Sequence, residues 1–283
     1  MIIPKKNKFI SCLTGCLLSV CIFIPQIANA QVTAFPMVLE LESKRGKSKG
    51  SINLKNEGNA AFRARVYAAP FTYNKNGFES LESSPNDLTP YLTFSPRELV
   101  VQPGQTRTIR VVSRFLPSMP QGEYRAVIFT ENLQVTETKK GSATIGIVPR
   151  IGMTVYARHG ELSPNFTVKD VRLNPENKQI QLLVKNSGEA TGFPQTNWIL
   201  TQGETQIGKG KVGDTTVITE GERYITIPTP FKDKQISAGS YQLSGDLIWG
   251  EKGNKLPFEL DFNISPEQAA AANKPKPERR NKL

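Results

Sequence analysis

Few residues in this chain of 283 could carry out acid–base, nucleophilic or metal chemistry. His159 is the single histidine, and no carboxylates cluster around it in the sequence, so it has no neighbours with which to bind a metal ion. Aspartates and glutamates are scattered, without the spacing of a catalytic pair. No phosphate-binding loop, dinucleotide fingerprint or nucleophile elbow occurs. We therefore expect no enzymatic activity, no cofactor, no metal and no small-molecule substrate.

The first thirty residues have the composition of a secretory signal. Three lysines precede an apolar stretch from Phe9 to Ile24, and Ala28-Asn29-Ala30 supplies small residues for cleavage. This pattern predicts a signal peptide over residues 1–30 and a mature chain that begins at Gln31 in the periplasm.

Two other interpretations of this segment stay open. It could be retained as an anchor, although the apolar stretch is shorter than the ~20 residues of a spanning helix. It could also be a lipoprotein signal, because Leu13-Thr14-Gly15-Cys16 resembles a bacterial lipobox. All three cysteines, Cys12, Cys16 and Cys21, lie inside the segment, so a mature chain cut after it would have no disulfide and no thiol chemistry.

The chain is basic, with 36 lysines and arginines against 25 aspartates and glutamates. Without the three signal lysines the net charge is 33 − 25 = +8. An exported protein seldom meets nucleic acid, so acidic surfaces or partner carboxylates are the expected targets. Part of the charge lies at residues 266–283. We predict a disordered basic tail there, because from Ala269 on the segment lacks residues that would build a core.

The mature sequence consists largely of short alternating segments. Ser51 to Lys55, Phe62 to Tyr67 and Arg107 to Val112 each alternate polar and apolar residues, which is typical of half-buried strands. Turn residues such as Asn56–Asn59 and Gln102–Gln105 separate them. Strands and turns at this spacing predict an all-β fold, built as a sandwich or a barrel.

Three landmarks of the first half recur in order in the second half. Leu54–Gly58 matches Val184–Gly188 (186 − 56 = 130), Gly122-Glu123-Tyr124 matches Gly239-Ser240-Tyr241 (239 − 122 = 117), and Gly104 matches Gly221 (221 − 104 = 117). Two copies of one sandwich are the economical explanation. We expect one domain over residues 32–158, a boundary near 156–160, and a second domain over 160–265.

The segment that is most informative for binding runs from Ala143 to Tyr156. Its apolar residues at odd positions share one face of an extended strand: Ile145, Ile147, Ile151, Met153 and Val155. Pro149 cannot donate a backbone hydrogen bond, which favours a position at a sheet edge. Such a strand either packs its apolar face into its own domain or pairs with another chain by strand addition, and the pattern alone leaves both open.

A second strand is apolar on both faces. From Tyr124 to Phe129, Ala126 and Ile128 fall on one face, and Val127 and Phe129 fall on the other. A strand of this kind must be covered either by its own protein or by a partner. Val127 and Phe129 are therefore candidate partner-binding residues.

Three stretches resemble the PapD-like periplasmic chaperones of chaperone–usher pili: Gly50–Tyr67, Phe94–Gly104, and Gly122–Arg125 leading into an apolar strand. The resemblance covers roughly residues 32–158. The second half is similar to that family by size, order and β pattern. The resemblance implies two immunoglobulin-like β-sandwich domains in an L-shaped, boomerang arrangement.

The resemblance also implies a function. Chaperones of this family lend a long edge strand to pilus subunits that lack their last strand. Here the donor strand would present Ile145, Ile147, Ile151 and Met153 to a fimbrial-type subunit. An outer-membrane usher is a further partner to consider.

The sequence departs from the family at the site that binds the subunit's terminal carboxylate. The family uses two basic residues, one on the first strand and one near the end of the donor strand. Neither Val32–Leu41 nor Met153–Tyr156 contains one. Arg150 is the candidate substitute, with an ordinary solvated arginine as the alternative. An exported structural or adhesive immunoglobulin-like protein and a secreted carbohydrate-active enzyme remain the other function classes.

Overall fold

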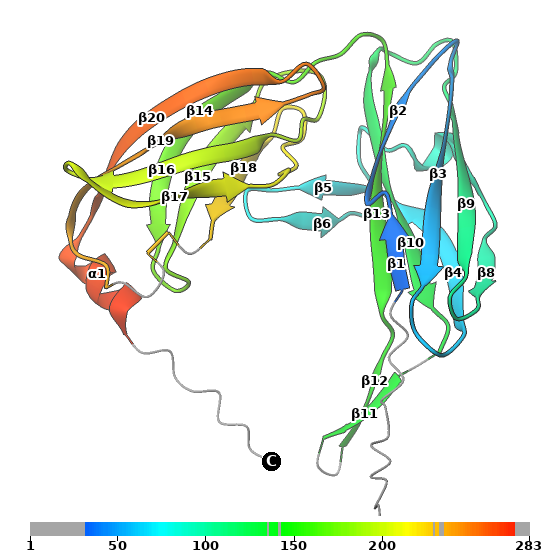
Figure 1. The fold of residues 1–283 in the computed structure, drawn as a ribbon. Helices are drawn as coiled ribbons and strands as arrows, with labels where there is room; N and C mark the ends of the chain where they lie inside the picture. Colours follow the sequence, from blue (N-terminus) through cyan, green and yellow to red (C-terminus); the bar gives the residue numbers. More distant parts are fainter. Residues whose placement is uncertain (1–31, 135, 141–142, 229, 232–234, 275–283) are drawn as a thin grey trace, which may run out of the picture.

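The computed structural model describes residues 32–134, 136–140, 143–228, 230–231 and 235–274, with the backbone alone for 136–140 and 143–147. The predicted signal peptide over 1–30, with its three cysteines, lies outside the described residues. The chain forms two lobes that meet at an angle and are connected at one end (Figure 1). We call residues 32–159 the first lobe and residues 166–274 the second lobe.

The first lobe is a sandwich of two sheets, which we call sheet A and sheet B. Sheet A has the order β1-β3-β9-β7, formed by Val32–Phe35, Lys47–Asn56, Thr106–Arg114 and Leu92–Ser95. Sheet B has the order β2-β13-β10-β4-β8, formed by Val38–Glu42, Arg150–His159, Gly122–Asn132, Phe62–Ala69 and Glu98–Val101. A short 3₁₀ turn at Thr89–Tyr91 precedes β7.

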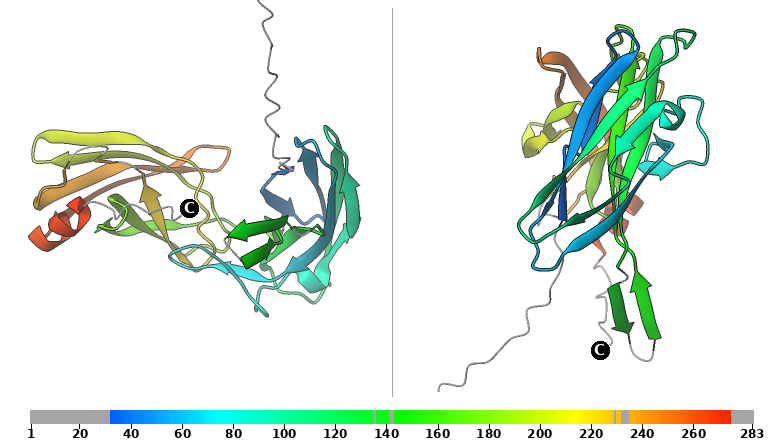
Figure 2. Two further views of the ribbon diagram at one scale, coloured as in Figure 1. Left: turned by 90° about the horizontal axis from the view of Figure 1, so that it is seen from below. Right: turned by 90° about the vertical axis from the view of Figure 1, so that its right-hand side faces the viewer.

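Two hairpins leave this sandwich. Strands β5 (Phe71–Tyr73) and β6 (Phe78–Ser80) reach from the first lobe to the second (Figure 1). Strands β11 (Thr136–Lys140) and β12 (Ala143–Ile147) extend past the end of β10 and β13, away from both sandwiches (Figure 2).

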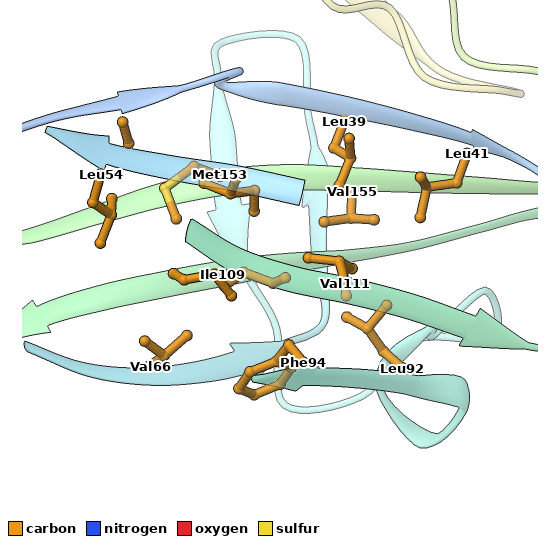
Figure 3. Packing of buried hydrophobic residues seen from close by; sticks show 14 of the residues in the cluster. Leu39, Leu41, Leu54, Val66, Leu92, Phe94, Ile109, Val111, Met153 and Val155 are labelled. Atoms are coloured by element: carbon orange, nitrogen blue, oxygen red, sulfur yellow. The ribbon is translucent and has the colours of Figure 1, made fainter. Parts of the chain in front are cut away.

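The two sheets of the first lobe close over an apolar core. Figure 3 shows Ile109 of β9 and the β13 residues Met153 and Val155 among the side chains that point into it. All three are fully buried. Alternate residues of each strand face the core because successive side chains of a strand point to opposite sides.

The second lobe is also a sandwich. One sheet has the order β14-β15-β18, formed by Phe166–Asn174, Gln179–Asn186 and Glu222–Ile227. The other has the order β17-β16-β19-β20, formed by Thr205–Val212, Gln195–Gln202, Gly239–Trp249 and Asn254–Ile264. The predicted all-β fold with two sandwiches is confirmed.

The first repeated landmark makes the same contacts in both lobes. Asn56 in the first lobe and Asn186 in the second are both fully buried. Each side-chain amide donates to the carbonyl four residues later and to a carbonyl of a distant segment. Each side-chain oxygen accepts a hydrogen bond from the N–H two residues later. These contacts are Asn56 to Ala60 (2.7 Å), Val101 (2.9 Å) and Gly58 (3.0 Å), and Asn186 to Ala190 (2.8 Å), Val217 (3.0 Å) and Gly188 (3.0 Å). These three hydrogen bonds recur in both lobes, as the repeated sequence predicted, and Asn186 accepts one more, from Asn165 N–H (3.0 Å).

The second landmark also recurs in three dimensions. The hydroxyl of Tyr124 donates to Pro120 O (3.2 Å), and the hydroxyl of Tyr241 donates to Ser237 O (2.9 Å). A tyrosine near the start of a late strand, bonded to the backbone a few residues upstream, is typical of immunoglobulin-like sandwiches. Both lobes are therefore immunoglobulin-like.

The predicted disordered tail over 266–283 is wrong for its first part, because Pro266–Asn273 form helix α1. Ser265 accepts from Gln268 N–H (3.2 Å) and donates its own N–H to the Gln268 side chain (2.9 Å), which is a capping box. Ala269 and Ala272 are buried against the second core. Alanine favours helices and packs in little space, so the absence of large apolar residues did not indicate disorder here.

Residues 275–283 of the predicted tail lie outside the described residues. Within the described part of the chain, no helix has the length and apolar character needed to cross a membrane.

Candidate partner-binding edge and interlobe cleft

Strand β13 is covered on one side along its whole length and on the other side only in part. It pairs antiparallel with β10 from His159, opposite Gly122, to Arg150, opposite Glu131. On its other side β2 pairs only with residues 154–158. Among the described residues, no strand pairs with 150–153 on that side, which we call the free edge.

The free edge presents backbone hydrogen-bonding groups. Thr154 N–H donates to Met37 O of the β2 side (3.0 Å), and Arg158 O accepts from Ser43 N–H on the same side (2.9 Å). Because neighbouring residues of a strand direct their N–H and C=O groups to opposite sides, Arg150 and Gly152 direct theirs to the free edge. An added strand would find these groups in position.

The edge is open because the first segment of the chain changes sheets. β1 pairs with β3 in sheet A, whereas β2 pairs with β13 in sheet B. Pro36 lies at the crossing and has no N–H with which to pair. Met37, which follows it, is 50% exposed beside the end of the free edge. The crossing therefore leaves one end of β13 unpartnered.

The apolar face of β13 packs into the first lobe. Met153 and Val155 are fully buried in its core, and Ile151 is partly buried at the rim. For Met153 the structure supports the interpretation that the face covers its own domain. Met153 has no exposed surface with which to make the predicted contact with a partner, whereas the side chain of Ile151 is partly exposed.

Val127 and Phe129 lie on the opposite face of sheet B. They are buried in a cluster with Phe71 and Tyr156, and Ile218 of the second lobe completes it. This second apolar face is thus covered from within the chain, by the β5–β6 hairpin and Arg150 of the first lobe together with Ile218 of the second lobe. Neither side chain offers surface to a partner here.

Arg150 lies at the free end of β13. Its guanidinium stacks over the Phe129 ring (4.5 Å) and donates to the Tyr67 hydroxyl (3.4 Å). It is eight residues from Arg158, or about 26 Å at ~3.3 Å per residue. Arg158, and not Arg150, lines the cleft between the lobes. The position of Arg150 therefore does not fit the carboxylate anchor that the sequence suggested.

Ile145 and Ile147 belong to β12, and their side chains lie outside the described structure. The backbone of β12 pairs with β11, with Ile145 opposite Thr138 and Ile147 opposite Thr136. The other edge of β12 has no pairing strand among the described residues. This edge and the free edge of β13 lie on the same side of one long hairpin, because Asn132 N–H donates to Pro149 O (3.0 Å) on the inner side.

Arg158 makes the polar connection between the lobes. Its guanidinium pairs with Glu40 (2.7 Å) and Glu123 (3.2 Å) of the first lobe and donates to Thr191 O of the second (2.9 Å). The side chain of Glu123 is fully buried. A basic residue held by two carboxylates of its own lobe has little capacity left for a foreign carboxylate.

Glu123 in turn accepts hydrogen bonds from the N–H of Thr191 (2.8 Å) and from its hydroxyl. Burial raises the pKa of Glu123, although these hydrogen bonds and the charge of Arg158 oppose the shift. Sequence reasoning missed this residue, because a glutamate beside a turn glycine gives no sign of burial.

A cleft of about 700 Å³ opens beside this network. Its charged lining residues are Glu40, Arg158, Asp214 and Glu251. Three carboxylates against one arginine make a poor site for an anionic group. Among the described residues, no three potential metal ligands come together, and the ring of His159 packs on Phe115 (5.3 Å between centroids).

The β5–β6 hairpin makes a second connection between the lobes. Lys75 O at its tip accepts from Tyr224 N–H (2.9 Å) of β18, and Lys75 pairs with Glu222 (2.8 Å). Arg223 donates to Asn74 O (3.3 Å). No strand was predicted for Phe71–Tyr73 or Phe78–Ser80. Asn76-Gly77 between aromatic residues was a turn signal that could have found this hairpin.

Neither a protein-family model nor a curated protein matches the sequence. Among the solved structures that the chain resembles are those of pilus and fimbrial chaperones. The CsuC–CsuE chaperone–tip adhesin complex of the archaic chaperone–usher Csu pili of Acinetobacter baumannii is 14% identical, over 81% of this chain and 98% of that one, with a TM-score of 0.46.

Two further structures are equally distant in sequence. The Salmonella enterica complex of the SafA pilin with the SafB chaperone is 13% identical, over 83% of this chain and 97% of that one, with a TM-score of 0.43. The E. coli chaperone DraB is 12% identical, over 83% of this chain and 98% of that one, with a TM-score of 0.43. Identities of this size say nothing of partners, so the function has to come from the geometry of this chain.

Proposed function

We propose that this chain is a periplasmic chaperone that binds incomplete subunits of a pilus-type surface fibre by β-strand addition. The observation that carries the proposal is the free edge of β13, where Arg150 and Gly152 direct N–H and C=O groups outward. The adjoining β12 adds Ile145 and Ile147, whose two-residue spacing suits pockets for alternate side chains. The chaperone acts by binding and catalyses no reaction.

The surroundings of the free edge support the proposal. Val148, between β12 and β13, is 46% exposed, and Met37 flanks the other end. A groove of about 430 Å³ beside the edge is lined by Val32, Phe62 and Ile151, among others. Pro149 and Arg150 protect the start of this edge. Val148, Met37 and part of Ile151 nevertheless leave apolar surface beside it, which favours a partner.

The rest of the first lobe holds the edge rigidly. β10 pairs with all of β13, and β2 pairs with its second half. The Glu123–Arg158–Thr191 network attaches the second lobe beside that half. A rigid donor strand loses little conformational entropy when it pairs, which favours tight binding without an energy source.

The compartment is part of the proposal. The signal-like pattern over residues 1–30 supports export. Subunits enter the periplasm unfolded, so a protein that adds a strand to incomplete subunits would act there. An outer-membrane usher is a proposed further partner, which would receive the subunit.

The experiment is co-expression in the periplasm with a fimbrial-type subunit that lacks its last strand. The same subunit with a complementary strand fused to its end is the control, because its groove is already filled. We expect the chain to co-purify with the incomplete subunit and not with the self-complemented one. Equal recovery of both subunits, or of neither, would overturn the proposal.

Two pairs of variants locate the contact. Ile145→Asp with Ile147→Asp should abolish binding, whereas Ile199→Asp should not, because Ile199 is an exposed isoleucine on β16 of the second lobe. Arg150→Pro removes an N–H from the free edge, and Arg150→Ala keeps it. Loss of binding in the proline variant alone would support backbone pairing.

A further inference from the structure

We propose that the outer face of sheet A binds an anionic lipid bilayer. The proposal is independent of the chaperone function, since it concerns the opposite sheet of the first lobe. In Figure 1, β3 and β9 form the side of the first lobe that is turned away from the second lobe. Figure 2 (right) views the molecule from that side.

The two sheets of the first lobe differ in charge. The four strands of sheet A contain no aspartate or glutamate but contain six basic residues: Lys47, Lys49, Lys55, Arg107, Arg110 and Arg114. The strands of sheet B are mixed, with five glutamates (Glu40, Glu42, Glu98, Glu123 and Glu131) and five arginines (Arg63, Arg65, Arg125, Arg150 and Arg158). Because the strands of sheet A contain no acidic residue, this sheet presents a positive field.

The register shows which of these basic residues face outward. Ser48 and Ser113 hydrogen-bond to each other in the interior (2.6 Å), so their neighbours in the strands point away from the core. Lys47 lies directly opposite Arg114, and Lys49 lies opposite Val112. Arg110 lies opposite Ser51 on the same face. All of the outward basic residues are exposed: Lys47, Lys49, Lys55, Arg110 and Arg114.

This arrangement opposes the stability of the free protein. Like charges directly opposite each other in an antiparallel pair are destabilising, and Lys47 and Arg114 are such a pair. In the described part of the chain, Lys47, Lys49, Arg110 and Arg114 have no ion pair. The adjacent turn adds Lys44 and Arg45, both exposed. An external anionic surface would relieve this repulsion.

The shape and the other side chains favour a bilayer as the source of the negative charge. The remaining outward residues of sheet A are mostly small and polar, including Ser51, Thr93 and Thr108. The face therefore presents long cations on a broad sheet of small polar residues. A cavity of about 560 Å³, lined by Arg107, Arg110 and Glu98 among others, lies where this face meets sheet B. Phe35 of β1 shares the face and is 47% exposed. Basic residues with an exposed aromatic are the combination that lies in a lipid headgroup region.

The test uses the full mature chain with vesicles of phosphatidylcholine alone or mixed with phosphatidylglycerol, measured by flotation. We expect binding to the phosphatidylglycerol vesicles only, and weaker binding as salt is added. Each basic residue near an anionic surface contributes about fivefold to affinity, so Lys49→Gln with Arg110→Gln should lower it about 25-fold. Lys209→Gln with Lys211→Gln, an equal loss of exposed charge on β17 of the second lobe, should change it less than twofold.

Circular dichroism of both double variants checks that they fold like the unaltered chain. Equal losses in the two double variants would overturn the proposal, because binding would then follow net charge and not this face. Failure of the unaltered chain to float with phosphatidylglycerol at low salt would overturn it as well. The proposal would also be overturned if the Lys49→Gln, Arg110→Gln variant bound vesicles as well as the unaltered chain does but no longer bound an acidic protein, because the face would then be a protein-binding site. Loss of subunit binding in the Arg150→Pro variant leaves this result unaffected, since the two surfaces are separate.

Discussion

The carboxylate of Glu123 in the first lobe accepts two hydrogen bonds from Thr191 in the second lobe, one from its N–H (2.8 Å) and one from its hydroxyl. Both residues are buried. The lobes are thus oriented by a directional contact in a place where water cannot replace it, and an unpaired Glu123 would be costly.

Replacing Glu123 with glutamine should change how stability depends on pH. The folded pKa of Glu123 is raised by burial, so the native state holds this proton more tightly than the unfolded state does. Its contribution is therefore greatest below the unfolded pKa of about 4.5, and it declines as pH rises through the folded pKa. Urea unfolding from acid to neutral pH should show the unaltered chain losing stability relative to Glu123→Gln across that range.

The matched control is Glu222→Gln. The hydrogen bond and charge of Lys75 lower the pKa of Glu222, so its contribution is present above about 4.5 and is lost on acidification. Its difference from the unaltered chain should change with pH in the opposite sense. A Glu123→Gln difference that stays constant, or that grows in favour of the unaltered chain with rising pH, would contradict the burial argument.

Replacing Arg158 with methionine should destabilise the protein by about 3 kcal/mol, because it leaves the buried charge of Glu123 without its cationic partner. Arg63→Met is the control. Arg63 pairs with Glu98 on the surface, with both side chains more than half exposed, and its loss should cost about 0–1 kcal/mol. Denaturant unfolding measures both. Equal costs would mean that Arg158 contributes no more than a surface charge.

Replacing either repeated asparagine with alanine should destabilise its own lobe by about 2 kcal/mol, since two carbonyls, at least one of them buried, lose their donor. Asn56→Ala should act on the first lobe and Asn186→Ala on the second, which amide exchange measured by NMR can resolve. Asn165→Ala removes an exposed contact with Ser187 (3.1 Å) and should have a much smaller effect. If both variants increased amide exchange in the same lobe, the two turns would not each stabilise their own lobe.

Replacing Arg223 with alanine should loosen the β5–β6 hairpin from the second lobe. The side chain loses its hydrogen bond to Asn74 O (3.3 Å) and its contact with the Tyr73 ring (4.9 Å). We expect a broader distribution of distances between spin labels placed on the two lobes. Arg172→Ala removes a similar contact within the second lobe, over Tyr224 (4.0 Å), and should leave the distribution unchanged. Identical distributions for all three proteins would show that the hairpin does not hold the lobes.

The sequence by itself determined the class and the internal repeat. Alternation of polar and apolar residues specifies strands because a strand has two faces, and this is a local property. The matches at Asn56 and Asn186, and at Tyr124 and Tyr241, were readable for the same reason, since each has at least one hydrogen bond to a residue two or four positions away. The bonds of the asparagines to Val101 and Val217 are with distant segments and could not be read in this way. The same local reasoning missed α1, where a capping serine and small alanines form a helix without large apolar side chains.

Only the tertiary structure decided which apolar surfaces are used internally. Met153 and Ile151 share one face of a strand in sequence, yet the core buries the first completely and leaves the second at its rim. Val127 and Phe129 resembled a partner-binding face, but the chain's own β5–β6 hairpin and Arg150, with Ile218 of the second lobe, cover them. Arg150 and Arg158 could not be told apart as anchors by composition, because their contacts are distant in sequence: Arg158 pairs with Glu40 and Glu123, whereas Arg150 contacts Phe129 and Tyr67. Contacts between distant segments follow from how sheets and lobes pack, and no pattern along one strand encodes them.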